Sequence, residues 1–392
     1  MDDVNCDSDE DLEFEVEQRQ RAQDLNLAPV ELGFAESLTN ETQRARLQSW
    51  HFPLGKIGGK PAWLAYKTLP TCEALLCQNC SKPMCFLLQL YAPLTEPTSA
   101  FHRSFFVFVC RAAACSQTNS SKNFAVFRCQ LPRENDFYAS DAAPDPDDEP
   151  DFKPDKTIAD FSTLCELCGC FGDKRCGRCE RVRYCCRDHQ AIDWKLSHKS
   201  NCTSAASGRD ETQSNGWLFV EYELVTETEE IDSEAANSEK SDEAKMAEYR
   251  EYLCDQQQQN KGDSMMDTNG AQEDATELDE VTPVKQDKTF RRFRKMLTHN
   301  PEQVLRYQRN GQPLFAAEVT DDNPVSDVPH CSACGAPRQF EFQIMPHLLE
   351  LLDVDSLEHS LDWATLLVFT CAQSCDTGNG YVNEYICKQD YE

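Results

Sequence analysis

Basic side chains and long apolar runs are both scarce in this sequence. Lysine and arginine number 38 against 68 aspartates and glutamates, so the formal net charge is −30. Binding to nucleic acid through bulk electrostatics needs a positive surface, and direct nucleic-acid binding is therefore not expected. The first residues, MDDVNCDSDEDLEFE, contain no basic stretch and no apolar core. No run approaches the about 18 apolar residues of a membrane span. We expect neither a secretory signal nor a membrane segment.

Catalytic patterns are also missing. The histidines outside the cysteine-rich part of the chain have no recognisable nucleophile partner, and no glycine-rich cofactor loop is visible. The stretch GKIGGKP leaves three residues between Gly55 and Gly59 and has Pro61 after its lysine. A phosphate-binding loop needs about four residues there and a serine or threonine after the lysine. A glycine turn leading into a strand, PAWLAY, is expected instead, and we predict that the protein is not an enzyme.

Cysteine, in contrast, is abundant, with 22 residues. Without a secretory signal the compartment is expected to be reducing, so paired cysteines indicate metal ligands rather than disulfides. Eight cysteines and two histidines fall within residues 165–202. They form two C-x2-C knuckles and two pairs spaced i, i+4, which share a helical face. In chain order the pairs are Cys165/Cys168, Cys176/Cys179, Cys185/His189 and His198/Cys202.

Four such pairs supply the ligands for two tetrahedral zinc ions. This assignment leaves Cys170 and Cys186 without a metal, and a pairing of Cys186 with His189 in place of Cys185 is the alternative. The segment has so few aliphatic residues that burial alone cannot fold it. Bound metal must therefore supply its folding free energy.

Two stretches of the chain are apolar enough to be globular, and they look alike. The first contains CQNCSKPMCFLLQL and FFVFVCRAAAC, and the second contains CSACGAPRQFEFQIM and LLVFTCAQSC. Their alignment pairs Phe86, Gln89 and Phe108 with Phe340, Gln343 and Phe369. It also aligns two sets of four cysteines. Cys77, Cys80, Cys110 and Cys115 form the first set, and Cys331, Cys334, Cys371 and Cys375 form the second. Each set offers a knuckle and a wider pair for one further zinc ion; free, buried thiols are the alternative.

The expected fold class is α+β and mainly β: a duplicated, zinc-supported β-rich module with a small zinc-binding insertion. Residues 221–280 contain 20 acidic and 4 basic side chains, which supply −16 of the net charge, and we expect them to be disordered. The expected divisions are an acidic disordered tail (1–27), a first module (28–133), an Asp/Pro-rich linker (134–164), the cysteine-rich segment (165–202), a strand-like run at 217–227 with the acidic insert (203–286 together) and a second module (287–390).

Three helices are predicted in the second module. The first helix is predicted over THNPEQVLRYQRNG, where Asn300 is a suitable N-cap and the pair Asn310-Gly311 would end the helix. The stretch PHLLELLDVDSLEH has helical spacing, and FRRFRK at 290–295 places Phe290 and Phe293 on one helical face. The basic side chains of that third helix are expected to face solvent; contact with RNA or with the acidic insert are the alternatives.

The order of ligands in residues 165–202 resembles the MYND finger, a two-zinc cross-brace. The resemblance implies that the first pair shares an ion with the third pair and the second with the fourth. His189 stands where most such fingers carry cysteine. The flanks ELGFAE, FPLGKIGGKPAWL, LPTCEALLCQNC, EQVLRYQRNGQPLF and DWATLLVFTCAQSC look like the two halves of the programmed cell death protein 2 family, in which such a finger is embedded.

That resemblance implies a non-enzymatic chaperone that captures a basic small-subunit ribosomal protein and supports 40S ribosome biogenesis. It further implies a place in cytoplasm and nucleus, a link to cell proliferation and stem-cell maintenance, and contacts with other ribonucleoprotein assembly factors. The acidity fits this function, because a free ribosomal protein is basic. The alternative is a nuclear corepressor or scaffold whose finger binds proline-containing peptides.

Overall fold

The computed structural model describes residues 20, 21, 23, 25, 27–48, 55–139, 148–149, 152–202, 216–229, 288–319, 325, 327–352, 354 and 361–391. The acidic tail and the acidic insert predicted from the sequence lie almost wholly outside these residues, and so does part of the predicted linker. The chain divides into two compact units, residues 229–286 and all the rest, and the description below concerns the second. Within the described chain no helix is both long and apolar enough to cross a membrane.

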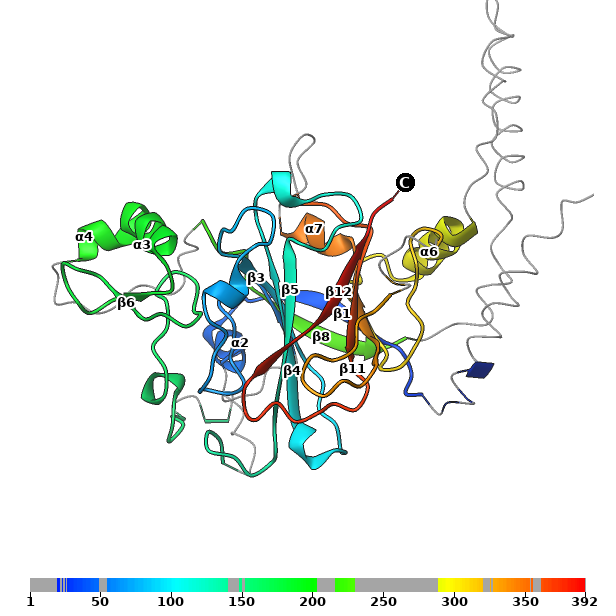
Figure 1. Ribbon diagram of the computed structural model, residues 1–392, viewed down its shortest axis with the longest axis horizontal. Coiled ribbons are helices and arrows are strands. Elements are labelled where there is room, and N and C mark those ends of the chain that lie inside the picture. The colour runs from blue at the N-terminus through cyan, green and yellow to red at the C-terminus, as the bar shows by residue number, and fades with distance from the viewer. Residues whose placement is uncertain are drawn as a thin grey trace, which may run out of the picture. The chain divides into compact units, whose positions relative to one another are not determined.

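Ten strands close into one barrel, in the order β1-β8-β2-β3-β4-β5-β12-β11-β10-β9 (Figure 1). All neighbouring pairs run antiparallel. The barrel strands are β1 (Glu31–Ser37), β2 (Gly55–Ile57), β3 (Cys85–Tyr91), β4 (His102–Val109), β5 (Phe124–Leu131), β8 (Tyr222–Thr228), β9 (Leu305–Tyr307), β10 (Arg338–Ile344), β11 (Thr365–Cys371) and β12 (Tyr381–Gln389). Two short strands, β6 (Lys174–Arg175) and β7 (Arg183–Tyr184), form a separate hairpin. The fold is mainly β, as the sequence indicates.

Both globular stretches contribute strands to the same barrel. We call residues 28–133 the amino-terminal half and residues 287–390 the carboxyl-terminal half. The strand-like run at 217–227 belongs to neither half in the sequence, yet it forms β8, which pairs with β1 on one side and β2 on the other. The chain that returns from the cysteine-rich segment is therefore a structural part of the barrel wall.

The two halves share local features at aligned positions. Phe86 lies opposite Phe108 across β3 and β4, just before a register shift, and Phe340 lies opposite Phe369 across β10 and β11, also just before one. These equivalences agree with the alignment made from the sequence, and the duplication itself stays a prediction.

A buried glutamine on each half holds the chain that crosses the outer face of the sheet. The Gln89 side-chain oxygen accepts the N–H of Ala62 at 3.1 Å, and the Gln343 oxygen accepts the N–H of Leu314 at 2.8 Å. The predicted strand over PAWLAY is wrong: this stretch bends across the sheet. Side chains accept hydrogen bonds from its backbone N–H groups: in addition to Gln89, the Tyr381 hydroxyl accepts the N–H of Ala65 at 3.1 Å.

Helices are short and lie outside the barrel wall. They are α2 (Glu41–Arg46), α3 (Arg187–Asp193), α4 (Lys199–Asn201), α6 (Lys288–His299) and α7 (His347–Leu351), with 3-10 turns η2 (Glu73–Leu75), η3 (Thr98–Ala100), η4 (Ala113–Cys115) and η5 (Ile158–Asp160) and a π-helical turn η6 (Trp194–His198). The predicted helix over FRRFRK is confirmed as α6, with Phe293 buried. The helix predicted in PHLLELLDVDSLEH is present only as the short α7, and the rest of that stretch is largely outside the described residues.

The helix predicted over THNPEQVLRYQRNG is wrong, because this stretch contains β9. Val304 and Leu305 are completely buried, and the N–H of Val304 donates to the carbonyl of Gly33 in β1. Burial against two neighbouring strands outweighs the local helix signals here. Asn310 adopts a φ of 61°, so the Asn-Gly pair makes a turn rather than a helix end.

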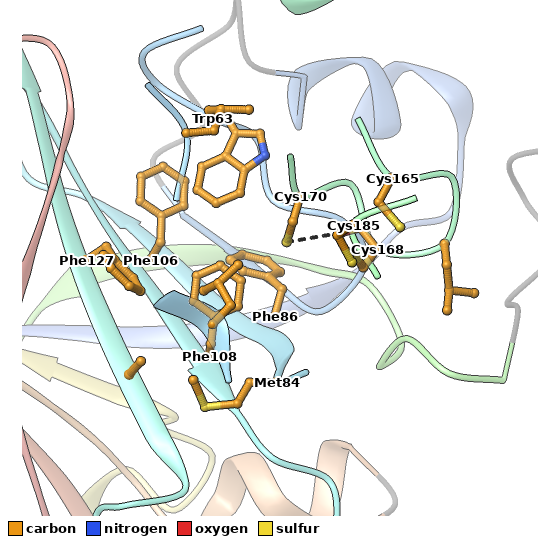
Figure 2. Packing of buried hydrophobic residues seen from close by; sticks show 14 of the residues in the cluster. Trp63, Met84, Phe86, Phe106, Phe108, Phe127, Cys165, Cys168, Cys170 and Cys185 are labelled. Atoms are coloured by element: carbon orange, nitrogen blue, oxygen red, sulfur yellow. Dashed lines mark hydrogen bonds between the residues drawn. The ribbon is translucent and has the colours of Figure 1, made fainter. Parts of the chain in front are cut away.

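The outer face of the amino-terminal half carries an aromatic layer. Trp63 stacks on Phe106 with ring centroids 5.0 Å apart and lies near Phe108 at 6.1 Å. Figure 2 shows cysteines of the 165–202 segment beside these rings, and both belong to one buried cluster. The cysteine-rich segment therefore covers this face of the barrel.

Candidate metal centres

Four groups of four metal-binding side chains lie in the described chain, each with its ligand atoms within 4.8 Å of one another. The groups are Cys77, Cys80, Cys110 and Cys115; Cys165, Cys168, Cys185 and His189; Cys176, Cys179, His198 and Cys202; and Cys331, Cys334, Cys371 and Cys375. Every residue that the sequence suggested as a ligand is brought into the group expected for it. The cross-brace order implied by the MYND resemblance is also the order found.

The distances within the groups fit zinc. A tetrahedral zinc ion with thiolates at about 2.3 Å holds neighbouring sulfur atoms about 3.8 Å apart. In the two halves of the barrel, Cys80 and Cys110 sulfurs are 3.7 Å apart and Cys331 and Cys375 sulfurs 3.8 Å. A donor set of three or four thiolates with at most one imidazole suits zinc. The number of ions stays a prediction.

All four knuckles use the same turn. The residue four positions after the first cysteine has a positive φ, between 54° and 74°, at Ser81, Gly169, Glu180 and Gly335. In each knuckle the N–H of that residue donates to the carbonyl of the first cysteine, at 2.8 or 2.9 Å. This tight turn points both sulfurs of the knuckle to one side, which explains why the C-x2-C spacing predicts a metal site so well.

The first centre of the finger uses Nδ1 of His189. This nitrogen lies 3.0 Å from the Cys185 sulfur and 3.8 Å from the Cys165 sulfur. The sulfur of the alternative ligand Cys186 has another contact: it caps α3 by accepting the N–H of His189 at 3.3 Å. The other ring nitrogen of His189 is buried, and Trp217 packs edge-on at a centroid distance of 4.3 Å. The geometry thus favours Cys185 over Cys186 as the metal ligand that pairs with His189.

The second centre of the finger uses Nε2 of His198, which lies 3.3 Å from the Cys176 sulfur and 3.5 Å from the Cys179 sulfur. Buried Tyr184 packs against the His198 ring and donates its hydroxyl proton to Asp193 at 2.6 Å. This pair was not singled out from the sequence, because the tyrosine and the aspartate lie on different elements.

Backbone N–H groups favour ionised thiols in two knuckles. Burial works to raise the pKa of Cys179, but the N–H groups of Val182 and Arg181 lower it to about 6. Burial likewise opposes ionisation of Cys331, and backbone N–H groups, with that of Cys334 first, lower its pKa to about 7. Metal binding requires thiolates, so the lowered thiol pKa values favour metal binding at these two knuckles.

The centre in the carboxyl-terminal half is held by a residue from the other half. Arg128 of β5 donates to the Cys375 sulfur at 3.4 Å and to the Cys375 carbonyl at 2.9 Å. Glu384 accepts a hydrogen bond from Arg128 at 2.6 Å and another from the N–H of Cys371 at 3.2 Å. Such outer contacts orient metal ligands and tune their basicity. No local pattern in the sequence marks Arg128.

The finger is attached to the barrel by specific contacts as well as by burial. The indole N–H of Trp63 donates to the carbonyl of Gly169 inside the first knuckle, at 2.7 Å. Lys82 of the amino-terminal knuckle pairs with Asp188 of α3 at 3.1 Å. The sulfur of Cys72, beside η2, lies within 4.8 Å of those of Cys185 and Cys186. The finger and the amino-terminal half therefore form one continuous packing unit.

The fold and these centres define a class of protein: a cysteine-rich, metal-binding β-barrel with an embedded zinc finger. Family models agree in three places, namely the N-terminal domain of programmed cell death protein 2 at residues 29–145, the MYND finger at 165–202 and the C-terminal putative domain of programmed cell death protein 2 at 287–390. The chain belongs to the programmed cell death protein 2 family.

Two of the similar proteins described here span most of the chain, and a third spans part of it. Programmed cell death protein 2 of Bos taurus is 40% identical over 366 residues, which is 92% of this chain and 96% of that protein. Programmed cell death protein 2-like of Homo sapiens is 30% identical over 339 residues, 82% of this chain and 88% of that protein. Probable 20S rRNA accumulation protein 4 of Schizosaccharomyces pombe is 33% identical over 163 residues, 39% of this chain and 36% of that protein. No solved structure matches.

Proposed function

We propose that this chain is a non-enzymatic chaperone that holds a basic protein of the small ribosomal subunit until assembly. The observation that carries the proposal is the similarity to the Schizosaccharomyces pombe protein named for 20S rRNA accumulation. The formal net charge of −30 supports it, because an acidic partner covers the charge of a free ribosomal protein. Other ribonucleoprotein assembly factors are further proposed partners.

In this proposal the two halves of the barrel are copies of one module, and together they form the body that holds the client. The four metal centres stabilise that body and take no part in catalysis. The chain acts in cytoplasm and nucleus, where ribosomal proteins are made and assembled. Its effect on cell proliferation and stem-cell maintenance follows from the supply of 40S subunits.

The alternative, a scaffold that reads proline-containing peptides through its finger, treats the finger as independent. Against this, Leu167 and Cys168 of the finger are buried in the same cluster as Phe86 and Trp63 of the barrel. Deletion of the finger would uncover this apolar face, and loss of binding after deletion would not distinguish the two functions. Point substitutions on the exposed side of the finger are needed instead, for example at Leu196, which is 50% exposed.

Depletion of the protein, with gradient analysis of ribosomal subunits, tests the proposal. We expect fewer free 40S subunits, unpaired 60S subunits and an insoluble or degraded client. Co-translational capture followed by mass spectrometry should identify that client, and Leu196→Asp should still bind it. An unchanged ratio of 40S to 60S, with altered transcription of a restricted set of genes, would favour the scaffold.

A further inference from the structure

The barrel wall opens locally where the two halves meet. β5 and β12 pair from Tyr381 and Cys129 to Glu384 and Val126, and their ladder ends there. β12 continues to Gln389. Figure 1 shows β5 and β12 diverging toward the carboxyl end of β12. We call this opening the seam.

Both sides of the seam keep their other partners. Phe124 and Ala125 of β5 pair with β4, and Ile386 and Cys387 of β12 pair with β11. None of these four residues has a counterpart across the described β5–β12 ladder. Alternate residues of an antiparallel strand bond to opposite sides, so only Phe124 and Ile386 point their backbone groups to the seam. The N–H of Phe124 already donates to the carbonyl of Ser121 at 2.9 Å, so the strand edge at the seam is that of β12.

The far end of the seam is closed by side chains. The N–H of Asn119 donates to the Asp390 carboxylate at 2.6 Å, and the N–H of Asp390 donates to the Asn119 side-chain oxygen at 2.9 Å. Lys388 adds a contact to the carbonyl of Gln117 at 3.1 Å. The opening thus has fixed ends: the last ladder pair on one side and this bridge on the other.

A cleft of about 310 Å³ lies at the seam. Its apolar wall includes Met84, Phe124 and Ile386, and its rim includes one residue from inside each barrel knuckle, Gln78 and Ser332. Both barrel knuckles therefore border the cleft, one from each half. Bound metal would hold both rims rigid, which lowers the entropy cost of binding a partner.

The charged groups at the cleft already satisfy each other. Arg338 donates to Glu384 at 2.9 Å, and Glu384 also pairs with buried Arg128. No excess of negative charge remains among these groups, so the cleft is unsuited to a tract of lysine and arginine. Its chemistry is an apolar pocket next to a strand edge.

We propose that the seam receives an extended segment of the client, which adds its backbone to the β12 edge and places an apolar side chain in the cleft. Strand addition combines backbone hydrogen bonds with a pocket for alternate side chains, and the seam offers both. This inference rests on the proposed function, since it locates the client of that function. The segment is apolar, and the client's basic regions are covered by acidic surface elsewhere.

Two adjacent substitutions in one knuckle test the proposal. Ser332 and Ala333 are both exposed between Cys331 and Cys334, but only Ser332 lines the cleft. With the full chain and the small-subunit ribosomal protein that co-purifies with it, Ser332→Trp should weaken binding at least about tenfold, because it fills the site of a buried anchor. Ala333→Trp should stay within about twofold of the wild type, and both variants should retain their zinc and their melting temperature.

The amino-terminal half provides a second, independent variant. Ala74 is exposed and lines the cleft from the amino-terminal half, so Ala74→Trp should also weaken client binding about tenfold. Because the seam contact is apolar, the difference between Ala74→Trp and the wild type should persist at high salt, where contacts between exposed charges are screened.

Hydrogen exchange gives a readout that does not depend on substitutions. The amide of Ile386, which points to the seam, should become protected when the client binds, whereas the amides of Ala125 and Cys387, which point to β4 and β11, should not change. Wild-type affinity in both Ser332→Trp and Ala74→Trp, with unchanged exchange at the seam, would overturn this proposal and leave the chaperone function standing. If the wild-type chain binds no small-subunit ribosomal protein, both proposals fail.

Discussion

Glu341→Ala should be among the most destabilising substitutions in the barrel. Glu341 of β10 and Arg103 of β4 are both completely buried, and they form two parallel hydrogen bonds of 2.7 and 2.9 Å. The carboxylate also accepts the Thr370 hydroxyl at 2.6 Å and the Tyr307 hydroxyl at 2.9 Å. Four N–H and O–H groups therefore converge on one buried carboxylate, and two of them, both from Arg103, come from the other half of the chain.

Removal of this carboxylate leaves the Arg103 guanidinium buried without its countercharge. Loss of one partner from a buried ion pair costs about 3–5 kcal/mol. We expect the free energy of unfolding to fall by that amount, measured by urea denaturation of the zinc-loaded protein. Glu227 of β8 is exposed, so Glu227→Ala should change stability by less than about 0.5 kcal/mol.

The pH dependence of this contribution has a definite sign. Burial works to raise the pKa of Glu341, but the charge and hydrogen bonds of Arg103 lower it below its ordinary value. A depressed pKa in the folded state gives stability that is present above the unfolded carboxyl pKa and lost as pH falls through the folded pKa. The stability difference between wild type and Glu341→Gln should therefore stay constant near neutrality and shrink only below about pH 4.3.

A double substitution decides whether the ion pair is responsible. Arg103→Met combined with Glu341→Met removes both charges, so it should recover much of the stability lost in Glu341→Ala. Strictly additive losses in the double variant, or a loss below about 1 kcal/mol in Glu341→Ala, would refute the reasoning.

Three further outcomes are expected. Cys168→Ser should release zinc to a chromogenic chelator and unfold the finger, whereas Cys170→Ser should not; equal zinc loss in both would contradict the ligand assignment. Elemental analysis should find four zinc ions per chain, two in the finger and one in each half of the barrel, and a value of two would show that the barrel cysteines are not ligands. Arg128→Met should lower the zinc affinity of the centre that contains Cys375 by about 10–100-fold, read as faster removal of one ion by chelator, while the other centres keep their rates.

The metal ligands of the finger could be predicted because their geometry is local. In each C-x2-C knuckle the turn closes within five residues, and the i, i+4 pairs need only a helical turn. Cys165 and Cys168 therefore indicate a metal site whatever tertiary structure surrounds them. The strands β3, β4 and β5 could also be predicted from the sequence, since short aromatic and β-branched runs between turn residues indicate strands.

The tertiary structure alone decided how these parts combine. The run containing Val304 and Leu305 has local helix signals, yet burial between β1 and β10 makes it a strand. Arg103 and Glu341 are 238 residues apart, and Trp63 reaches Gly169 across 106 residues. Such contacts depend on which strands become neighbours, a choice made by the packing of the whole barrel. For the same reason the seam between β5 and β12 has no signature in either strand: it exists only because strands from the two halves meet, pair over part of their length and then separate.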